Sequence, residues 1–201
     1  MSHKNFTRGR GLLENFLAHQ RFLVADRLIA KEHRQGRILD IGCGVVPYFL
    51  LQTQFNEKHG LDPYIKDEQV KQFAHKISFH KIFITKETLL PLENQSFFAV
   101  TMLGVVEHFN QESFICLLKE IKRILKSEGV FILTTPSPWT RWLLKLMAKL
   151  YLISREEIEG IMESYSQNKI KDCLTSAGFD IKKMRFAHFQ MFLNSWMVVE
   201  K

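Results

Sequence analysis

The sequence predicts an α/β fold in which a mostly parallel sheet ends in an antiparallel hairpin. Short apolar runs alternate with amphipathic segments through residues 36–135, a turn with two glycines follows the first apolar run, and two extended segments lie close together near residue 188. Alternating strands and helices favour a parallel sheet. The last two strands are too close together for a helical crossover, so they are expected to pair antiparallel.

The elements follow in order along the chain. Strands are expected at 38–41, 59–61, 77–80, 97–103, 130–134, 180–187 and 190–199. Helices are expected at 10–34, 47–54, 66–75, 114–125, 139–153, 156–164 and 170–177, with Gly129 and Gly178 as helix-ending residues. We expect one domain over residues 1–201, with a helical extension at 1–35 and a helical lid insertion at 139–165.

The composition limits the class of protein. The chain has 201 residues and no run near the roughly 20 apolar residues of a membrane span, and its basic start has no apolar segment typical of a signal peptide. Three widely spaced cysteines suggest no disulfide framework, which favours a cytoplasmic location, and eight scattered histidines give no metal spacing. The net charge of +7 permits acidic partners without choosing among them.

The turn after the first strand carries most of the functional signal. Asp40 ends an apolar run, Gly42 and Gly44 follow at alternate positions, and Pro47 opens the next helix. Glycines let the chain turn sharply and let a ligand approach the main-chain N–H groups. The next helix also begins with unpaired N–H donors. A small polar ligand is therefore expected at this turn.

A second acid narrows the ligand. Asp62 follows Asp40 by 22 residues and ends the next strand, where a carboxylate can accept hydrogen bonds from both hydroxyls of a ribose. A dinucleotide site would want a further glycine at Pro47, and it gives no reason for an acid just before the turn. A cofactor with a charged amino-acid tail does need an acid just before the turn, because its ammonium group is positive. The sequence therefore favours S-adenosylmethionine over a nicotinamide dinucleotide.

The chain resembles the class I S-adenosylmethionine-dependent methyltransferases, in particular the methyltransferase type 11 kind. The stretches that carry the resemblance read RILDIGCG, HGLDPY, LPLENQSFFAVTMLGVVEHF and IKRILKSEGVFILTTP. The resemblance implies a Rossmann-like sheet of seven strands, the last antiparallel, with helices on both faces. It also implies that the cofactor is S-adenosylmethionine.

The same resemblance implies roles for individual residues. The methionine part of the cofactor falls to Asp40, Gly42, Cys43 and Gly44; the ribose to Asp62; the adenine to Pro63; and the amino-acid tail to Leu103 and Gly104. The acid that commonly meets adenine is absent after the third strand, so Phe83 is expected to form a wall of that pocket.

Two further regions bear on the acceptor. His108 is the candidate general base, because an imidazole acts near neutral pH; alternatively it caps a helix or packs, and Glu107 orders the loop. Residues 139–153 have an apolar stripe opposite basic residues only, which suits a lid, a dimer contact or a membrane surface. Trp142 and Tyr165 are the candidate acceptor contacts.

The sequence favours methyl transfer to a small molecule, which could be lipid-like or glycan-linked. A nucleic-acid methyltransferase is the alternative enzyme, although Gly104-Val105-Val106-Glu107 replaces the Asn/Asp-Pro-Pro-aromatic motif of many base-modifying enzymes. The non-enzymatic alternative is a binding module that has kept the fold. The oligomeric state is open.

Overall fold

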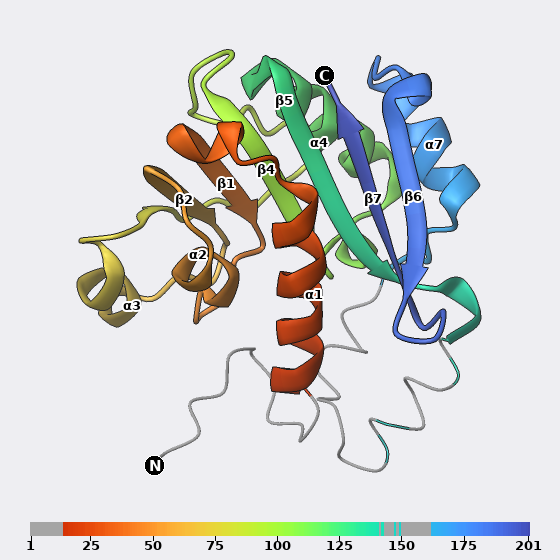
Figure 1. The fold of residues 1–201 in the computed structure, drawn as a ribbon, viewed down its shortest axis with the longest axis horizontal. Helices are drawn as coiled ribbons and strands as arrows, with labels where there is room; N and C mark the ends of the chain where they lie inside the picture. Colours follow the sequence, from red (N-terminus) through yellow and green to blue (C-terminus); the bar gives the residue numbers. More distant parts are fainter. Residues whose placement is uncertain (1–13, 141, 143–146, 148, 150–161) are drawn as a thin grey trace.

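The fold is a seven-stranded sheet in the order β3-β2-β1-β4-β5-β7-β6 (Figure 1). The computed structural model describes residues 14–140, 142, 147, 149 and 162–201. The strands are β1 Arg37–Ile41, β2 Glu57–Leu61, β3 Ser78–His80, β4 Phe97–Leu103, β5 Leu125–Pro136, β6 Met184–Phe189 and β7 Asn194–Glu200. The first five are parallel, and β7 is antiparallel to both β5 and β6. This confirms the predicted fold class.

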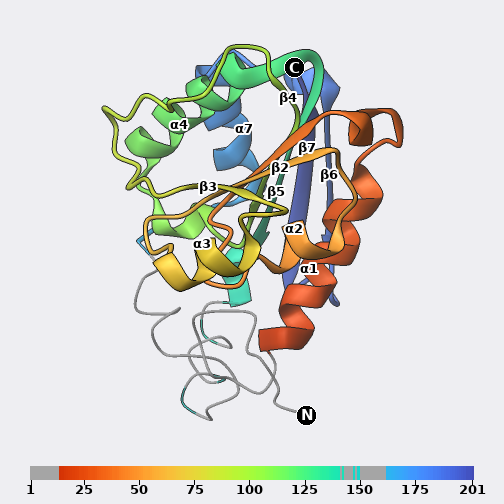
Figure 2. The same ribbon diagram turned by 90° about the vertical axis from the view of Figure 1, so that its left-hand side faces the viewer.

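Helices cover both faces of this sheet (Figure 2). The α-helices are α1 Glu14–Leu28, α2 Tyr48–Gln52, α3 Asp67–Phe73, α4 Gln111–Ile124 and α7 Gln167–Ser176. Short 3-10 helices are η1 Glu32–Gln35, η2 Val106–His108, η3 Pro138–Thr140 and η4 Ile181–Lys183. Figure 2 shows α4 and α7 on one side of the sheet and α1 on the other.

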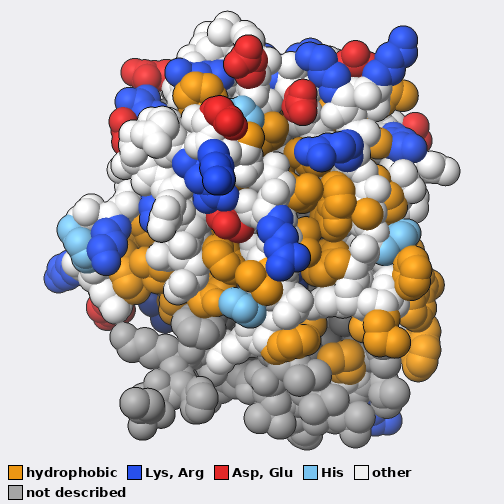
Figure 3. Space-filling model, viewed as in Figure 1, with side chains coloured by type: hydrophobic (Ala, Val, Ile, Leu, Met, Phe, Trp, Pro, Cys, Tyr) orange, Lys and Arg blue, Asp and Glu red, His pale blue; other side chains and the backbone are white. Residues whose placement is uncertain are grey.

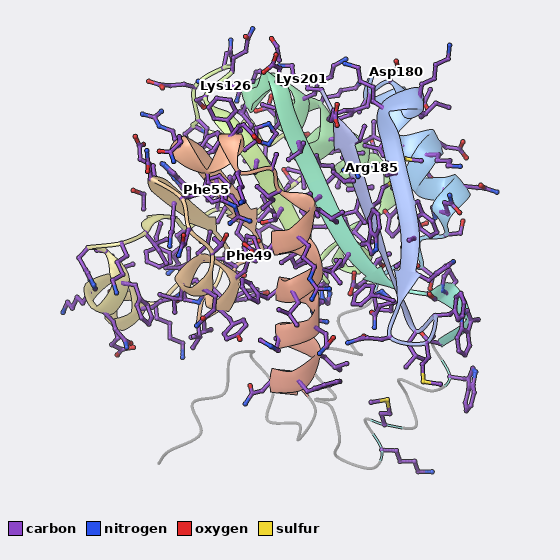
Figure 4. All side chains as sticks on the ribbon, in the orientation of Figure 1. Phe49, Phe55, Lys126, Asp180, Arg185 and Lys201 are labelled. Atoms are coloured by element: carbon purple, nitrogen blue, oxygen red, sulfur yellow. The ribbon has the colours of Figure 1, made fainter. Side chains whose placement is uncertain are left out.

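Each face has its own hydrophobic core. The larger cluster joins α4 and α7 to the sheet, where Phe114, Leu118 and Leu174 are fully buried. The smaller cluster lies under α1 and α2 and includes Ala25 and Phe49. Phe49 lies beside α1 in Figure 4, and its ring centroid is 6.1 Å from that of Phe22. The helix expected ahead of the sheet is therefore a covering layer of the sheet.

Strand β4 is apolar on both faces because it lies in the middle of the sheet. Ala99, Val100 and Met102 are fully buried, and β4 pairs with β1 on one side and β5 on the other. A continuous apolar run is typical of a parallel strand covered on both faces. Its predicted bounds, 97–103, are confirmed.

The prediction that Gly129 ends a helix was wrong. Helix α4 ends at Ile124, and β5 begins at the next residue, Leu125, so that Gly129 lies inside the strand. The register between β4 and β5 shifts between Phe97 and Ala99, where β5 holds extra residues. The glycine relieves crowding there, because an added Cβ would lie 3.0 Å from the carbonyl oxygens of Lys126 and Phe97.

The other expected elements are present with different bounds. The helix over 10–34 is found as α1 and η1, and Gly178 follows α7 with a φ of 85°. Of the helix expected over 139–153, residues 139–140 belong to η3 and residues 142, 147 and 149 are helical, whereas the rest lies outside the described residues. Most of the helix expected over 156–164 also lies outside them, and residues 162–164, which are described, are not helical. Within the described residues, no helix combines the length and apolar character needed to cross a membrane.

Candidate cofactor and active site

The glycine turn after β1 is fixed against the end of β2. The amides of Gly42 and Cys43 both donate to the carbonyl of Leu61, at 2.7 and 3.3 Å. Gly42 and Gly44 have φ values of 76° and 73°, a region that favours glycine. A Cβ on Gly42 would lie 2.4 Å from Val105, whereas a Cβ on Gly44 would come no closer than 4.0 Å to another atom. Gly42 therefore serves packing, and the chain is open beside Gly44.

Asp62 joins this turn to the end of β2. Its carboxylate accepts hydrogen bonds from the amides of Gly44, at 3.2 Å, and Tyr64, at 2.8 Å. The Gln69 side chain donates to the carbonyl of Gly44 at 2.9 Å. Asp62 is 2% exposed. The acid expected to bind a ribose therefore also positions the turn.

Asp40 is buried one residue before the end of β1 and faces β4. It accepts a 2.7 Å hydrogen bond from the hydroxyl of Thr101, its cross-strand neighbour. Burial, reinforced by the negative charge of Asp62 and opposed by the Thr101 hydrogen bond, raises the pKa of Asp40 to about 7. Asp40 is thus an acid that titrates near neutral pH.

Helix α1 brings a cation to the carboxyl end of β4. Arg21, half-buried on α1, lies over Gly104: a Cβ built on that glycine would be 3.2 Å from Nη1 and 3.4 Å from Cζ of the guanidinium. Gly104 has a φ of 71°, and its amide donates to the carbonyl of Thr134 at the end of β5. Arg21 is therefore held at the edge of the sheet that carries the glycine turn.

Glu107 lies next to this cation. It is 8% exposed, and its Oε2 has no hydrogen-bond partner among the described residues. Burial raises the pKa of Glu107, although its backbone hydrogen bond, the charges of His108 and Arg21, and the Thr135 hydroxyl act in the opposite direction. Its main-chain oxygen accepts from the amides of Met162 and Glu163. A buried acceptor left open beside a guanidinium is a feature of a ligand site.

A family model described as Methyltransferase domain matches residues 16–183 of the chain. The chain belongs to the methyltransferase domain family. Together with the seven-stranded sheet, this identifies a class I methyltransferase and implies S-adenosylmethionine as its cofactor. Both expectations from the sequence are confirmed.

Several individual proteins are similar to this chain in sequence or in structure. MJ1252 of Methanocaldococcus jannaschii, described as an uncharacterized protein, is 27% identical over 179 residues, which cover 79% of this chain and 68% of that protein. A SAM-dependent methyltransferase structure from Archaeoglobus fulgidus has a TM-score of 0.66 at 16% identity and is covered over 94% of both chains. A larger chain from Nostoc punctiforme has a TM-score of 0.66 at 18% identity, covering 92% of this chain and 57% of its own length. At 16% and 18% identity, the likeness to these two solved structures shows the fold alone.

The remaining cofactor candidates of the methyltransferase differ in what they can contact. Cys43 is 7% exposed, and its side chain packs in the smaller hydrophobic cluster beneath the turn. Its amide donates to the carbonyl of Leu61. Leu103 and Pro63 are half-buried at the same edge of the sheet. Phe83 is 69% exposed on the loop after β3, between two residues that pack on the core. Its role as an adenine wall stays a prediction.

The acceptor candidates are also separated by the structure. Tyr165 is 1% exposed: its hydroxyl donates to the carbonyl of Phe109 at 3.1 Å, and its ring packs edge-on against Phe114 at 5.2 Å. Its ring belongs to the core cluster, and burial raises the pKa of Tyr165. Its expected contact with the acceptor stays a prediction. Trp142 is 63% exposed, and His108 is exposed on η2 beside Glu107. Their roles stay predictions.

The sequence interpretation missed Arg21. Its position in the middle of an amphipathic helix gives no sign that it meets Gly104, which is 83 residues later. The signal that could have found it is chemical, since a zwitterionic cofactor tail needs a cation and residues 40–44 and 62–64 include acids but no basic residue. No group of three or more metal-ligating side chains forms among the described residues.

Proposed function

We propose that this methyltransferase transfers the methyl group of S-adenosylmethionine to a small-molecule acceptor of lipid-like or glycan-linked character. The observation that carries the proposal is the juxtaposition of an open turn at Gly44 with Arg21 over Gly104, at one edge of the sheet. Ligands of parallel α/β sheets bind at this edge, beyond the carboxyl ends of the strands. The cytoplasmic location and the single-domain division stay predictions from the sequence.

The residues at this edge match the charges of the cofactor. Arg21 is suited to the carboxylate of the methionine tail, because a guanidinium binds a carboxylate through two parallel hydrogen bonds. Asp40 and the open Oε2 of Glu107 are suited to the ammonium group. Asp62 retains lone pairs for the ribose, and the amide edge at Gly44 is open to the ligand.

The bound cofactor supplies a methyl group activated by a sulfonium, which passes to a nucleophile by in-line displacement. The protein contributes mainly alignment and a site of suitable polarity. A base is needed only where the acceptor must lose a proton. His108 is the exposed candidate and Glu107 the buried one, and their pH profiles would differ because burial raises the pKa of Glu107.

Titration calorimetry with two ligands tests this assignment. S-adenosylhomocysteine carries the amino-acid tail, whereas 5′-methylthioadenosine lacks it. Arg21→Met should weaken the binding of S-adenosylhomocysteine by about 10- to 100-fold, the worth of a hydrogen bond to a charged group, and leave 5′-methylthioadenosine unchanged. Arg27→Met, which removes an exposed arginine of the same helix, is the matched control.

Three results would decide the proposal. An equal loss of affinity for both ligands in Arg21→Met would mean that Arg21 supports the fold rather than binding the amino-acid tail. No binding of either ligand by the unaltered protein at millimolar concentration would contradict the enzymatic function. The acceptor class is tested with methyl-labelled cofactor and separate lipid, glycan and RNA fractions, and label in RNA alone would reject the small-molecule proposal.

A further inference from the structure

The main-chain oxygen of Glu107 joins η2 to a segment far along the chain. It accepts hydrogen bonds from the amides of Met162 and Glu163, at 2.9 and 3.2 Å. These bonds act on the backbone of the residue whose buried Oε2 has no hydrogen-bond partner among the described residues. A fixed backbone limits where the Glu107 carboxylate can lie, because the side chain occupies staggered rotamers relative to that backbone. The segment at 162–163 therefore helps to decide where this acid points.

Tyr165 holds the other end of η2. The carbonyl of Phe109, the residue that follows η2, accepts from the Tyr165 hydroxyl at 3.1 Å. The same hydroxyl lies 3.2 Å from Oε2 of Glu163. The Tyr165 ring packs edge-on against Phe114, with 5.2 Å between the ring centroids, so the core holds the hydroxyl in place. Both ends of η2 are thus bound by one short stretch of chain.

The carboxylate of Glu163 ties this stretch to two helices. It accepts from the side chain of Lys169 on α7 and from the backbone of Gln111, the first residue of α4. The Lys169 hydrogen bond is the main reason that the pKa of Glu163 lies below its usual value, so this carboxylate is ionised at neutral pH. Lys169 also lies over the ring of Tyr165, 5.1 Å from its centroid. Glu163 is therefore the residue at which η2, α4 and α7 are connected.

An ion pair alone would carry little weight in this protein. The chain has 28 Lys and Arg residues, and Figure 3 shows Lys and Arg side chains across one face. Exposed ion pairs contribute little to stability. Glu163 differs from such a pair in two respects: its side chain is only 30% exposed, and its own amide bonds to Glu107. Its carboxylate and its backbone therefore act on η2 together.

We propose that Glu163 is a positioning residue for methyl transfer, which fixes η2 so that the open oxygen of Glu107 faces the ammonium group of the cofactor. The inference rests on the proposed function, which assigns that oxygen to the ammonium group. Glu163 acts through Glu107, because its own carboxylate is taken by Lys169. Without Glu163, the carboxylate of Glu107 is drawn to the nearby positive charge of Arg21. That pairing would withdraw both groups that the amino-acid tail requires.

A double-mutant cycle with two ligands tests this role. S-adenosylhomocysteine carries the ammonium group, and 5′-methylthioadenosine does not. In titration calorimetry, Glu163→Ala should weaken the binding of S-adenosylhomocysteine by about tenfold, within the worth of a hydrogen bond to a charged group, and leave 5′-methylthioadenosine unchanged. In a Glu107→Gln background the same substitution should cause no further loss of affinity, since the group that it positions has lost its charge.

Three further variants complete the test. Glu163→Gln keeps an acceptor oxygen and should retain most of the affinity. Glu112→Ala is the matched control, because it removes an exposed acid of α4 that pairs with Lys86 at 3.6 Å, and it should bind both ligands like the unaltered protein. If Glu163→Ala does not fold, Tyr165→Phe makes the same comparison, because it removes only the hydroxyl that holds the end of η2.

Unchanged affinity for S-adenosylhomocysteine in Glu163→Ala would overturn the inference. So would an equal loss of affinity for both ligands, because Glu163 would then support the fold alone. A loss of the same size with and without Glu107→Gln would also overturn it, because Glu163 would then act independently of Glu107. If the unaltered protein binds neither ligand, the proposed function and this inference are both rejected, whereas binding by the unaltered protein separates the two.

Discussion

The amide of Gly44 donates to the carboxylate of Asp62 across 3.2 Å, so the turn after β1 and the acid after β2 form one unit. The acid that we propose for the ribose thus also shapes the turn that we propose for the methionine part of the cofactor. The same carboxylate accepts from Tyr64, which fixes the chain as it leaves β2. Changes at Asp62 are therefore expected to reach both halves of the cofactor.

Asp62→Ala should lower the affinity for S-adenosylhomocysteine by about 100-fold and the free energy of unfolding by about 1–3 kcal/mol, because it removes the carboxylate that accepts from the partly buried amides of Gly44 and Tyr64. Asp62→Asn keeps one acceptor oxygen, so its affinity and its stability should both lie between those of the unaltered protein and those of the alanine variant. Calorimetry and urea unfolding measure both effects. Unchanged affinity in the alanine variant would remove Asp62 from the site.

Cofactor affinity should rise with pH through neutrality, because the ammonium group prefers an ionised Asp40. The pKa of Asp40 in the folded protein is raised to about 7 from 3.8, so ionisation costs stability as pH rises through this range. S-adenosylhomocysteine should bind about tenfold more weakly at pH 6 than at pH 8. In Asp40→Asn this step should disappear; if it persists there, Glu107 or another group is responsible.

The two glycines of the turn should respond differently to alanine. Gly42→Ala should cost about 2–5 kcal/mol of stability, from the left-handed backbone together with the contact to Val105. Gly44→Ala should cost only the backbone share, about 1–2 kcal/mol, because its Cβ meets open space. That Cβ would instead lie where we propose that the cofactor binds. Gly44→Ala is therefore expected to be the milder folding variant and to bind S-adenosylhomocysteine poorly.

His59 and His80 should make the protein sensitive to acid. Nδ1 of His59 lies 3.0 Å from Nε2 of His80 across β2 and β3, so a single proton is shared between the two nitrogens. Burial lowers the pKa of both imidazoles below 6.5. The stability that this pair contributes is present above pH 6.5 and is lost as pH falls below it. In urea unfolding, His80→Gln should lose less stability than the unaltered protein as pH falls below 6.5. An equal loss of stability in the two proteins would assign the acid sensitivity to other groups.

Much of the fold could be predicted because its signals are local. Apolar runs, a proline at a helix start and a glycine after α7 each act on their own neighbourhood. The prediction at Gly129 failed because the helix and strand meet without a loop, and because a Cβ there would crowd the carbonyl oxygen of Phe97 on β4 as well as that of Lys126 on its own strand. A residue whose reason lies in another strand cannot be assigned from its own segment.

In the candidate site too, residues with a local sequence signal could be predicted, whereas residues that depend on contacts between distant segments could not. Asp40, Gly42, Gly44 and Asp62 could be found because strand ends and turn residues leave a readable pattern, and the structure brings them together. Arg21 and the open oxygen of Glu107 arise only when α1 packs on the sheet. The burial of Tyr165 could not be predicted, because an aromatic residue near a lid gives the same sequence pattern whether it faces a ligand or the core.

The position of β7 bears on how the chain is synthesised. β7 lies between β5 and β6, yet β6 precedes it in the sequence, and within the described sheet β6 pairs with β7 alone. On the ribosome, β6 therefore emerges with no strand to join and waits for residues 194–200. Until they arrive, the edge of β5 stays bare and invites pairing with other chains. A stop codon or a stalled ribosome anywhere between β6 and β7 should produce an aggregating fragment rather than a smaller folded protein.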